Sequence, residues 1–139
     1  MTNANDTDHY RLQYDLPNSW SLKYNLIYQY IVGIEVFPQS VIDTEISYLM
    51  KNHLNAYGIP LNYHATFTKL DWVSWIAAMA SNEADRLELF HRLFNFAHTT
   101  PQRVPLTDWY DTITGHQQGF QARPVVGALY GWILLHSQN

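Results

Sequence analysis

Residues 101–123 hold the side chains of this chain that are best suited to chemistry. Two carboxylates, Asp108 and Asp111, lie three residues apart, accompanied by three aromatic residues and two arginines. A carboxylate can take a proton from water, and a carboxylate pair beside aromatic rings is also typical of glycosidic cleavage. The stretch lacks a helical apolar period, and loops of this length in compact domains are usually functional or disordered. Its aromatic content argues against disorder, so we interpret it as an ordered functional loop.

A second long connection, residues 59–67, adds candidates just before a strongly apolar segment. It contains Tyr63 and His64, and Lys69 and Asp71 follow it. An imidazole suits proton transfer near neutral pH, but a hydrogen-bonded structural histidine fits this position equally well. Asp71 fits either a direct chemical role or the structural role of an acid in the first turn of a helix.

The loop residues have structural alternatives as well. Asp108 and Asp111 could form Asx turns, while Arg123 could hold the loop closed against a carboxylate or clamp a substrate carboxylate. Trp109 lies between polar residues and is a candidate pocket wall. The candidate catalytic residues are Asp71, Asp108 and Asp111, and the candidate substrate-binding residues are Tyr63, His64, Lys69, Trp109, Tyr110, Gln118, Phe120 and Arg123.

Composition limits the remaining function classes. The 139 residues, 47% of them hydrophobic, suffice for one domain, residues 1–139, with a real core. The lack of cysteine excludes disulfides and thiolate chemistry, and the seven histidines show no metal-binding spacing, so no metal or cofactor is predicted. A net charge of −4 without a basic run argues against a nucleic-acid partner, and no apolar stretch long enough for a membrane span occurs. We expect a small polar substrate, and the compartment is undetermined.

Apolar periodicity predicts five helices that must position these side chains. They cover about Trp20–Glu35, Ser40–Tyr57, Asp71–Ala80, Ala84–His98 and Pro124–Leu135. Thr68 and Asp71 form a T-x-x-D pattern, which predicts a capping box at the start of the third helix. The segment Asp111–Gly115 is interpreted as a tight turn, and Gly127 and Gly131 predict close approach by another backbone.

The lengths of the connections predict how these helices are arranged. Short connections follow the first and third helices, and long ones follow the second and fourth. Short links favour antiparallel neighbours, so both long loops should meet at one end of an all-α fold. The first, third and fifth helices are the most evenly apolar and would form an inner layer, as in an α-hairpin toroid or solenoid. Helix N-termini at that end would suit a small polar or anionic ligand.

Three long segments carry a resemblance to a known family. They are SWSLKYNLIYQYIVGIEVFP at 19–38, YGIPLNYHATFTKLDWVSWIAAMA at 57–80, and VPLTDWYDTITGHQQGFQARPVVGALYGWILL at 104–135. The chain resembles the C-terminal part of the glutaminase A family. That resemblance implies antiparallel α-hairpins forming part of an (α/α)₆ toroid, with the N-terminal β-rich region and the earlier hairpins absent. It also suggests an extracellular or cell-surface location.

The resemblance and the residues together leave three hypotheses for function. The leading one is a contribution to hydrolysis of the L-glutamine side-chain amide, with an aspartate activating water and His64 or Lys69 as donors. The second is a carbohydrate-active toroid of the glycoside hydrolase type. The third is a non-catalytic fragment that binds a partner chain or the missing part of the toroid, because a partial toroid leaves apolar flanks exposed.

Overall fold

The structure is a computed structural model that describes residues 3–137, so the predicted domain 1–139 extends slightly beyond it at both ends. Its elements are η1 (Tyr24–Leu26), α1 (Ile27–Val32), α2 (Gln39–His53), β1 (Phe67–Lys69), α3 (Leu70–Met79), α4 (Glu83–Thr99), β2 (Trp109–Asp111), η2 (Pro124–Tyr130) and α5 (Gly131–His136). The chain is therefore mainly helical, as predicted, with a small two-stranded sheet that the sequence did not predict. The toroid itself stays a prediction.

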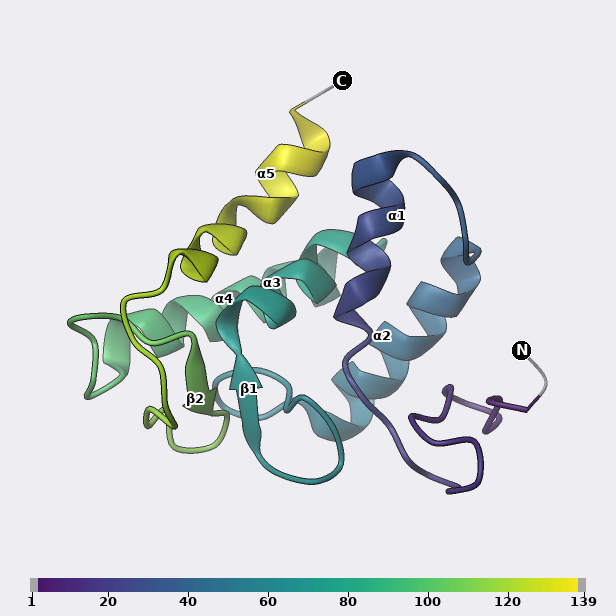
Figure 1. Cartoon of the computed structure of the whole chain (residues 1–139), viewed down its shortest axis with the longest axis horizontal. Helices are drawn as coiled ribbons and strands as arrows, with labels where there is room; N and C mark the ends of the chain where they lie inside the picture. The colour runs from purple at the N-terminus through teal and green to yellow at the C-terminus, as the bar shows by residue number, and fades with distance from the viewer. Residues whose placement is uncertain (1–2, 138–139) are drawn as a thin grey trace.

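Helix α3 lies at the centre of the fold (Figure 1). It contacts α4, η2, α5 and α1, and its residues Val73, Ile76 and Ala77 are fully or almost fully buried. Each large apolar side chain buried in this way contributes about 1.5–3 kcal/mol. Trp72 and Trp75 are half-buried, and Trp72 stacks on Tyr24 with ring centroids 3.9 Å apart. A helix that is apolar almost all round is thus enclosed on most sides, as its sequence indicates.

The predicted capping box at the start of α3 is wrong. Thr68 lies in β1, and Lys69 occupies the N-cap position without a side-chain cap hydrogen bond. The long loop takes over the role of the cap, because the N–H of Leu70 donates to the carbonyl oxygen of Asp108 at 2.8 Å. Asp71 does lie in the first turn of the helix, as expected.

The first predicted helix is shorter than expected, and the last one covers its predicted residues but is divided into η2 and α5. Gly33 ends α1 in the left-handed conformation, with φ of +68°, which is the usual role of glycine after a helix. Before η1, the chain instead pairs with the second long connection, since the N–H of Leu22 donates to the carbonyl of Leu61 at 2.8 Å. The predicted close approach of another backbone is wrong at both Gly127 and Gly131. No atom lies within 4 Å of a Cβ added to Gly127, and the atom nearest to a Cβ added to Gly131 belongs to the Trp75 side chain.

The two long connections meet, as their predicted position at one end requires. Strand β1 pairs with β2 in antiparallel register, with Lys69 opposite Trp109 and Phe67 opposite Asp111. The two strands form a ribbon, the β1–β2 ribbon, which continues where the N–H of Thr112 donates to the carbonyl of Thr66 at 2.9 Å. The tight turn at Asp111–Gly115 is confirmed, since the N–H of Gly115 donates to the carbonyl of Asp111 and its φ is +71°.

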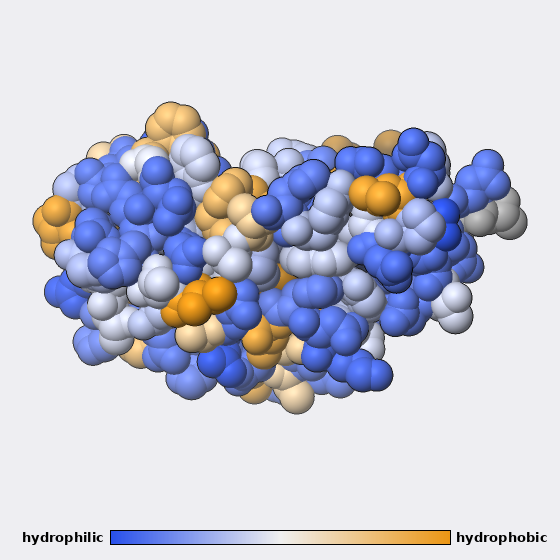
Figure 2. All heavy atoms as spheres, turned by 90° about the horizontal axis from the view of Figure 1, so that it is seen from below, coloured by the Kyte–Doolittle hydropathy of each residue, from blue (hydrophilic) through white to orange (hydrophobic). Residues whose placement is uncertain are grey.

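The surface differs from one side of the molecule to the other. Figure 2 shows that the lower face is mostly hydrophilic, with only separate hydrophobic residues. Helices α1 and α5 lie at the opposite side (Figure 1) and expose apolar side chains there. These are Tyr28, Val32 and Ile133, which we call the α1–α5 flank. Within residues 3–137, no helix is long and apolar enough to cross a membrane.

Candidate active site

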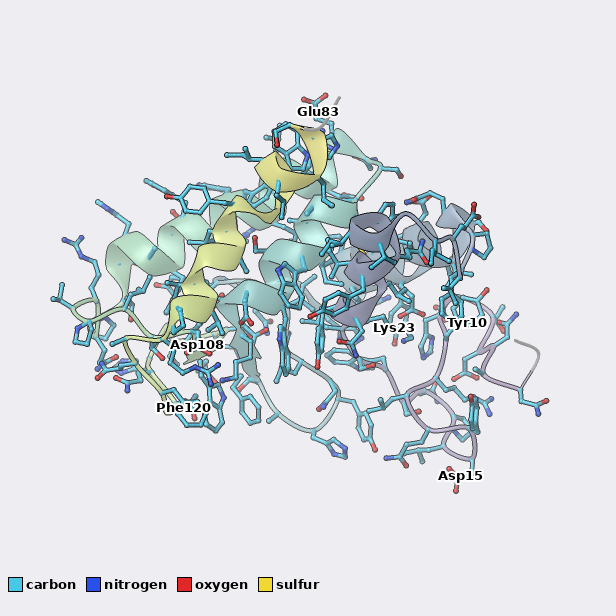
Figure 3. All side chains as sticks on the ribbon, turned by 45° about the horizontal axis from the view of Figure 1, so that its top comes forward. Tyr10, Asp15, Lys23, Glu83, Asp108 and Phe120 are labelled. Atoms are coloured by element: carbon cyan, nitrogen blue, oxygen red, sulfur yellow. The ribbon has the colours of Figure 1, made fainter. Side chains whose placement is uncertain are left out.

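The ribbon and the start of η2 bring one carboxylate and two cations together. Asp108 is fully buried. Its Oδ2 lies 3.1 Å from Lys69 Nζ and 2.9 Å from Arg123 Nη2, and its Oδ1 accepts from Arg123 Nε at 3.1 Å. Figure 3 shows Asp108 beside the first turn of η2. Arg123 therefore holds the loop through a two-pronged ion pair, the first of its two expected roles.

Two aromatic rings cover this ion cluster. Lys69 Nζ lies 4.6 Å from the ring centroid of Trp109 and 4.8 Å from that of Phe120. The guanidinium of Arg123 lies 4.7 Å from the Phe120 ring. Cations at such distances are attracted to the ring faces. Trp109 and Phe120 thus cover the ion cluster on one side, and the role of Trp109 as a pocket wall stays a prediction.

Gly119 determines where the Trp109 ring can lie. A Cβ added to Gly119 would lie 2.4 Å from an atom of that ring, closer than real Cβ contacts. We expect Gly119→Ala to lower the free energy of unfolding by about 1–3 kcal/mol, since the ring must shift away from Lys69. Urea unfolding of both proteins measures this, with Gly127→Ala as the matched control because its added Cβ meets no atom. Equal losses in the two variants would contradict the packing argument.

Asp71 lies apart from the ion cluster, in the wall of an apolar pocket of about 440 Å³. Only 4% of Asp71 is exposed, and its Oδ1 has no hydrogen-bond partner among the described residues. The pocket lies between α1, α3 and the η2–α5 segment, and the hydroxyl of Ser74 holds η2 against α3 by donating to the carbonyl of Ala128 at 2.9 Å. The sequence gives no sign of this pocket, because its walls come from segments far apart in the chain.

The surroundings of Asp71 disfavour its charged form. Burial raises the pKa of this carboxyl above its ordinary value, and the nearby Asp108 carboxylate acts in the same direction, while Lys69 opposes both. A carboxyl whose pKa lies closer to neutral pH can both accept and return a proton. Such a group in a pocket is a candidate for a functional site.

Asp111 and Tyr110, in contrast, have structural surroundings. Burial alone would raise the pKa of Asp111, but hydrogen bonds from Thr66 and from the backbone and hydroxyl of Thr114 outweigh it, so the pKa is lowered. Asp111 also accepts from the N–H of Ile113 at 2.9 Å, which completes an Asx turn. Tyr110 is fully buried, and burial raises the pKa of its phenol. Its hydroxyl donates to the carbonyl of Tyr57 at 2.9 Å.

The remaining predicted residues lie at other positions in the two long connections. The rings of Tyr63 and His64 lie 4.0 Å apart between centroids, tilted by 36°, and line a separate pocket with Trp20. Gln118 is exposed, and its N–H extends the ribbon by donating to the carbonyl of Trp109 at 2.8 Å. The structure therefore brings together five of the predicted residues, which are Lys69, Asp108, Trp109, Phe120 and Arg123, and leaves Asp71 in the apolar pocket and the others along the ribbon and its connections.

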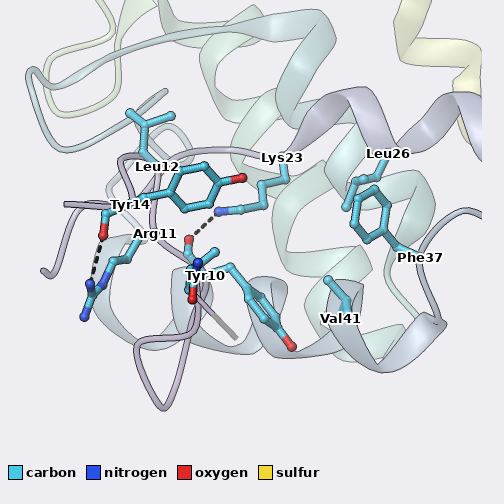
Figure 4. Close-up of a pocket in the computed structure, with 10 residues that line it drawn as sticks. Tyr10, Arg11, Leu12, Tyr14, Lys23, Leu26, Phe37 and Val41 are labelled. Carbon is cyan, nitrogen blue, oxygen red and sulfur yellow. Dashed lines mark hydrogen bonds between the residues drawn. The ribbon is translucent and has the colours of Figure 1, made fainter. Parts of the chain in front are cut away.

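Another pocket, of about 730 Å³, contains no predicted site residue (Figure 4). Its wall includes Lys23, whose Nζ already donates to Glu45 Oε2 and to the carbonyl of Tyr10, both at 2.7 Å. Arg11, the other cation of the wall, pairs with Asp6 at 2.7 Å, so both cations are neutralised. In the part of the chain that the structure describes, no group of three or more His, Asp or Glu side chains could hold a metal ion.

Comparisons with known proteins identify relatives of the chain. Residues 1–133 match the family model described as the glutaminase A six helical-hairpin domain. The chain is 34% identical over 131 residues to glutaminase A of Aspergillus oryzae (strain ATCC 42149 / RIB 40), covering 91% of this chain and 19% of that protein. It is 29% identical over 161 residues to a probable glutaminase of Arthroderma benhamiae (strain ATCC MYA-4681 / CBS 112371), covering 95% and 19%. The chain thus spans about a fifth of the length of these relatives. No solved structure matches it significantly.

Proposed function

We propose, from the premise that this chain belongs to the glutaminase A six helical-hairpin domain family, that it contributes to hydrolysis of the L-glutamine side-chain amide. Both relatives carry glutaminase in their names, which supports the reaction class. The observation that carries a direct role for this chain is the Asp71 carboxyl, which is buried, lacks a partner for Oδ1 among the described residues, and lies in the wall of an apolar pocket, near enough to Asp108 and Lys69 for their charges to affect its pKa.

Asp71 is the proton-transfer group in this proposal. As a carboxylate it takes a proton from water while the water oxygen bonds to the amide carbon, and it returns that proton to the leaving nitrogen as the carbon–nitrogen bond breaks. The products are glutamate and ammonia, and Asp71 ends in its starting state. Asp108 suits this role less well because both of its oxygens are already engaged by Lys69 and Arg123.

Arg123 and the aromatic wall position the substrate. Nε and Nη2 of Arg123 bond to Asp108, while Nη1 has no hydrogen bond among the described residues. The side chain is 37% exposed, so Nη1 can reach the α-carboxylate of glutamine. Lys69 beneath the two rings adds positive potential for the developing oxyanion. The glycosidic alternative has less support, since it needs two working carboxylates and Asp108 is held by two cations.

The test is ammonia release from L-glutamine by this chain in its full-length context, with Arg123→Lys as the variant. Lysine keeps a cation beside Asp108 but lacks the third nitrogen of the guanidinium. We expect KM for glutamine to rise about tenfold with kcat nearly unchanged. The matched control is 4-aminobutyramide, which lacks the α-carboxylate and should be processed equally by both proteins. A wild-type protein that releases no ammonia from glutamine would overturn the proposal.

The α1–α5 flank supports a further part of the proposal, a partner that covers it. Its exposed apolar side chains would be unusual on an isolated domain. The relatives are about five times longer than the matched region, since it makes up 19% of each. We therefore propose that the rest of a six-hairpin domain packs against this flank.

A further inference from the structure

The pocket beside Asp71 is much larger than the leaving group of glutamine requires. Its volume is about 440 Å³, within the range of small-molecule sites, whereas a molecule the size of ammonia or water needs only about 30 Å³. We propose that this pocket binds a primary amine with an apolar body, through an ion pair between its ammonium group and Asp71. The preferred substrates are then γ-glutamyl amides whose nitrogen carries an apolar substituent. The part of this proposal that concerns the preferred substrates rests on the proposed function.

The walls of the pocket suit an apolar body. Its lining includes Ile27 and Ile31 of the α1 side, Trp75 of α3, and Tyr130 and Leu134 of the η2–α5 side. In Figure 1, α1 and α5 lie on the same side of α3, which places these walls around one space. Among the lining residues of the described chain, Asp71 is the only one with a charged side chain. The pocket is therefore apolar with a single anionic point.

The charge at that point favours a cation over a neutral ligand. Asp71 is 96% buried, as its 4% exposure implies, and its Oδ1 lacks a partner in residues 3–137. A buried carboxylate oxygen without a partner is costly, and an ammonium group supplies both an opposite charge and three donors. The rings of Trp75 and Tyr130 add faces that attract cations. A neutral apolar ligand would leave the carboxylate unpaired.

Hydrolysis of such a γ-glutamyl amide would release this amine next to the pocket. In hydrolysis of an N-substituted amide, the water oxygen bonds to the carbonyl carbon, the carbon–nitrogen bond breaks, and both protons of the water end on the nitrogen, one by way of Asp71 and the other from the carboxylic acid that forms. The products are glutamate and a primary ammonium ion. Because Asp71 returns the proton to that nitrogen in the proposed function, the substituent on the nitrogen must lie in the space next to Asp71. The pocket is thus the leaving-group side of the site.

Binding to the chain itself tests the amine site without any need for activity. Isothermal titration calorimetry with benzylamine and with benzyl alcohol compares a cation with a neutral molecule of the same body. We expect benzylamine to bind at least about tenfold more tightly, and Asp71→Asn to remove that advantage. The matched control is Asp15→Asn, an exposed acid far from the pocket (Figure 3), which should change nothing. Equal affinities for the two molecules, or no loss in Asp71→Asn, would overturn the amine site.

Activity in the full-length context tests the substrate class separately. We expect kcat/KM for the γ-glutamyl amide of benzylamine to exceed that for glutamine by about tenfold, because the apolar substituent gains burial. A preference for glutamine with benzylamine binding intact would overturn the substrate class. Hydrolysis of neither amide with benzylamine still bound would overturn the proposed function and support the amine site. Glutamine hydrolysis without benzylamine binding would support the proposed function and overturn the amine site.

Discussion

Asp71→Asn is expected to lower kcat for glutamine by at least about 100-fold in the full-length context, because general acid–base catalysis typically contributes 10²–10⁴-fold. An amide of nearly the same shape cannot take the proton from water or return it to nitrogen. The fold should survive, since Asp71 makes no ion pair, and its Oδ1 has no hydrogen-bond partner among the described residues. Ammonia release under saturating glutamine measures the effect.

The raised pKa of Asp71 also predicts two pH dependences. In the proposed function activity needs its carboxylate form, so the acid limb of kcat/KM should lie above the ordinary pKa of aspartate, which is about 3.9. Stability behaves differently, because a raised pKa means that the folded state disfavours the charge. That destabilisation is absent below the pKa that Asp71 has in the unfolded state. It grows as pH rises from there and is complete once pH has passed through the pKa of Asp71 in the folded state. Asn lacks it, so at neutral pH the variant should melt no lower than the wild type.

Asp111→Asn is the matched control for the loss of activity. Asp111 belongs to the same ribbon, but its oxygens hold the turn through the N–H groups of Ile113 and Thr114. We expect its loss to lower the melting temperature slightly and to leave kcat within a few-fold of the wild type. If Asp111→Asn loses as much activity as Asp71→Asn, or if Asp71→Asn keeps full activity, Asp71 is not the proton-transfer group.

The sequence predicted those parts of the fold that depend on local pattern. The central helices α2, α3 and α4 follow from apolar spacing and turn signals, and Asn82 caps α4 by accepting from the N–H of Ala84 at 2.8 Å. The meeting of the two long connections followed from their alternation with short ones. That alternation depends only on helix direction, so it could be inferred without knowing any side-chain contact.

The roles of the three candidate aspartates could not be separated in this way. Strands β1 and β2 have three residues each, too few to show an alternating pattern. Their pairing is what places Asp108 between Lys69 and Arg123, and what leaves Asp71 behind in the pocket. The same pairing satisfies the N–H of Leu70, so the Thr68 cap was not needed. Long-range pairing therefore decided which carboxylate is held by cations and which is not.

Asp108→Ala is expected to lower the free energy of unfolding by about 3–5 kcal/mol, the usual cost of removing one partner from a buried ion pair. Asp108 is fully buried and Lys69 is only 9% exposed. The variant would leave a nearly buried ammonium without its counter-ion and would release Arg123 from the loop. Guanidinium or urea unfolding followed by circular dichroism measures this. The loss is a large share of the 5–15 kcal/mol that stabilises a typical domain.

Two comparisons decide whether the ion cluster is the cause. Glu88→Ala breaks the half-exposed Glu88–Arg92 pair on α4, and pairs at the surface contribute at most about 1 kcal/mol, so this control should be far milder. In the double variant Asp108→Ala with Arg123→Gln, one of the two unpaired cations is gone, so the combined cost should be clearly less than the sum of the single costs. Additive losses would mean that Asp108 acts through its backbone and packing, and that Arg123 is free to serve the substrate without it.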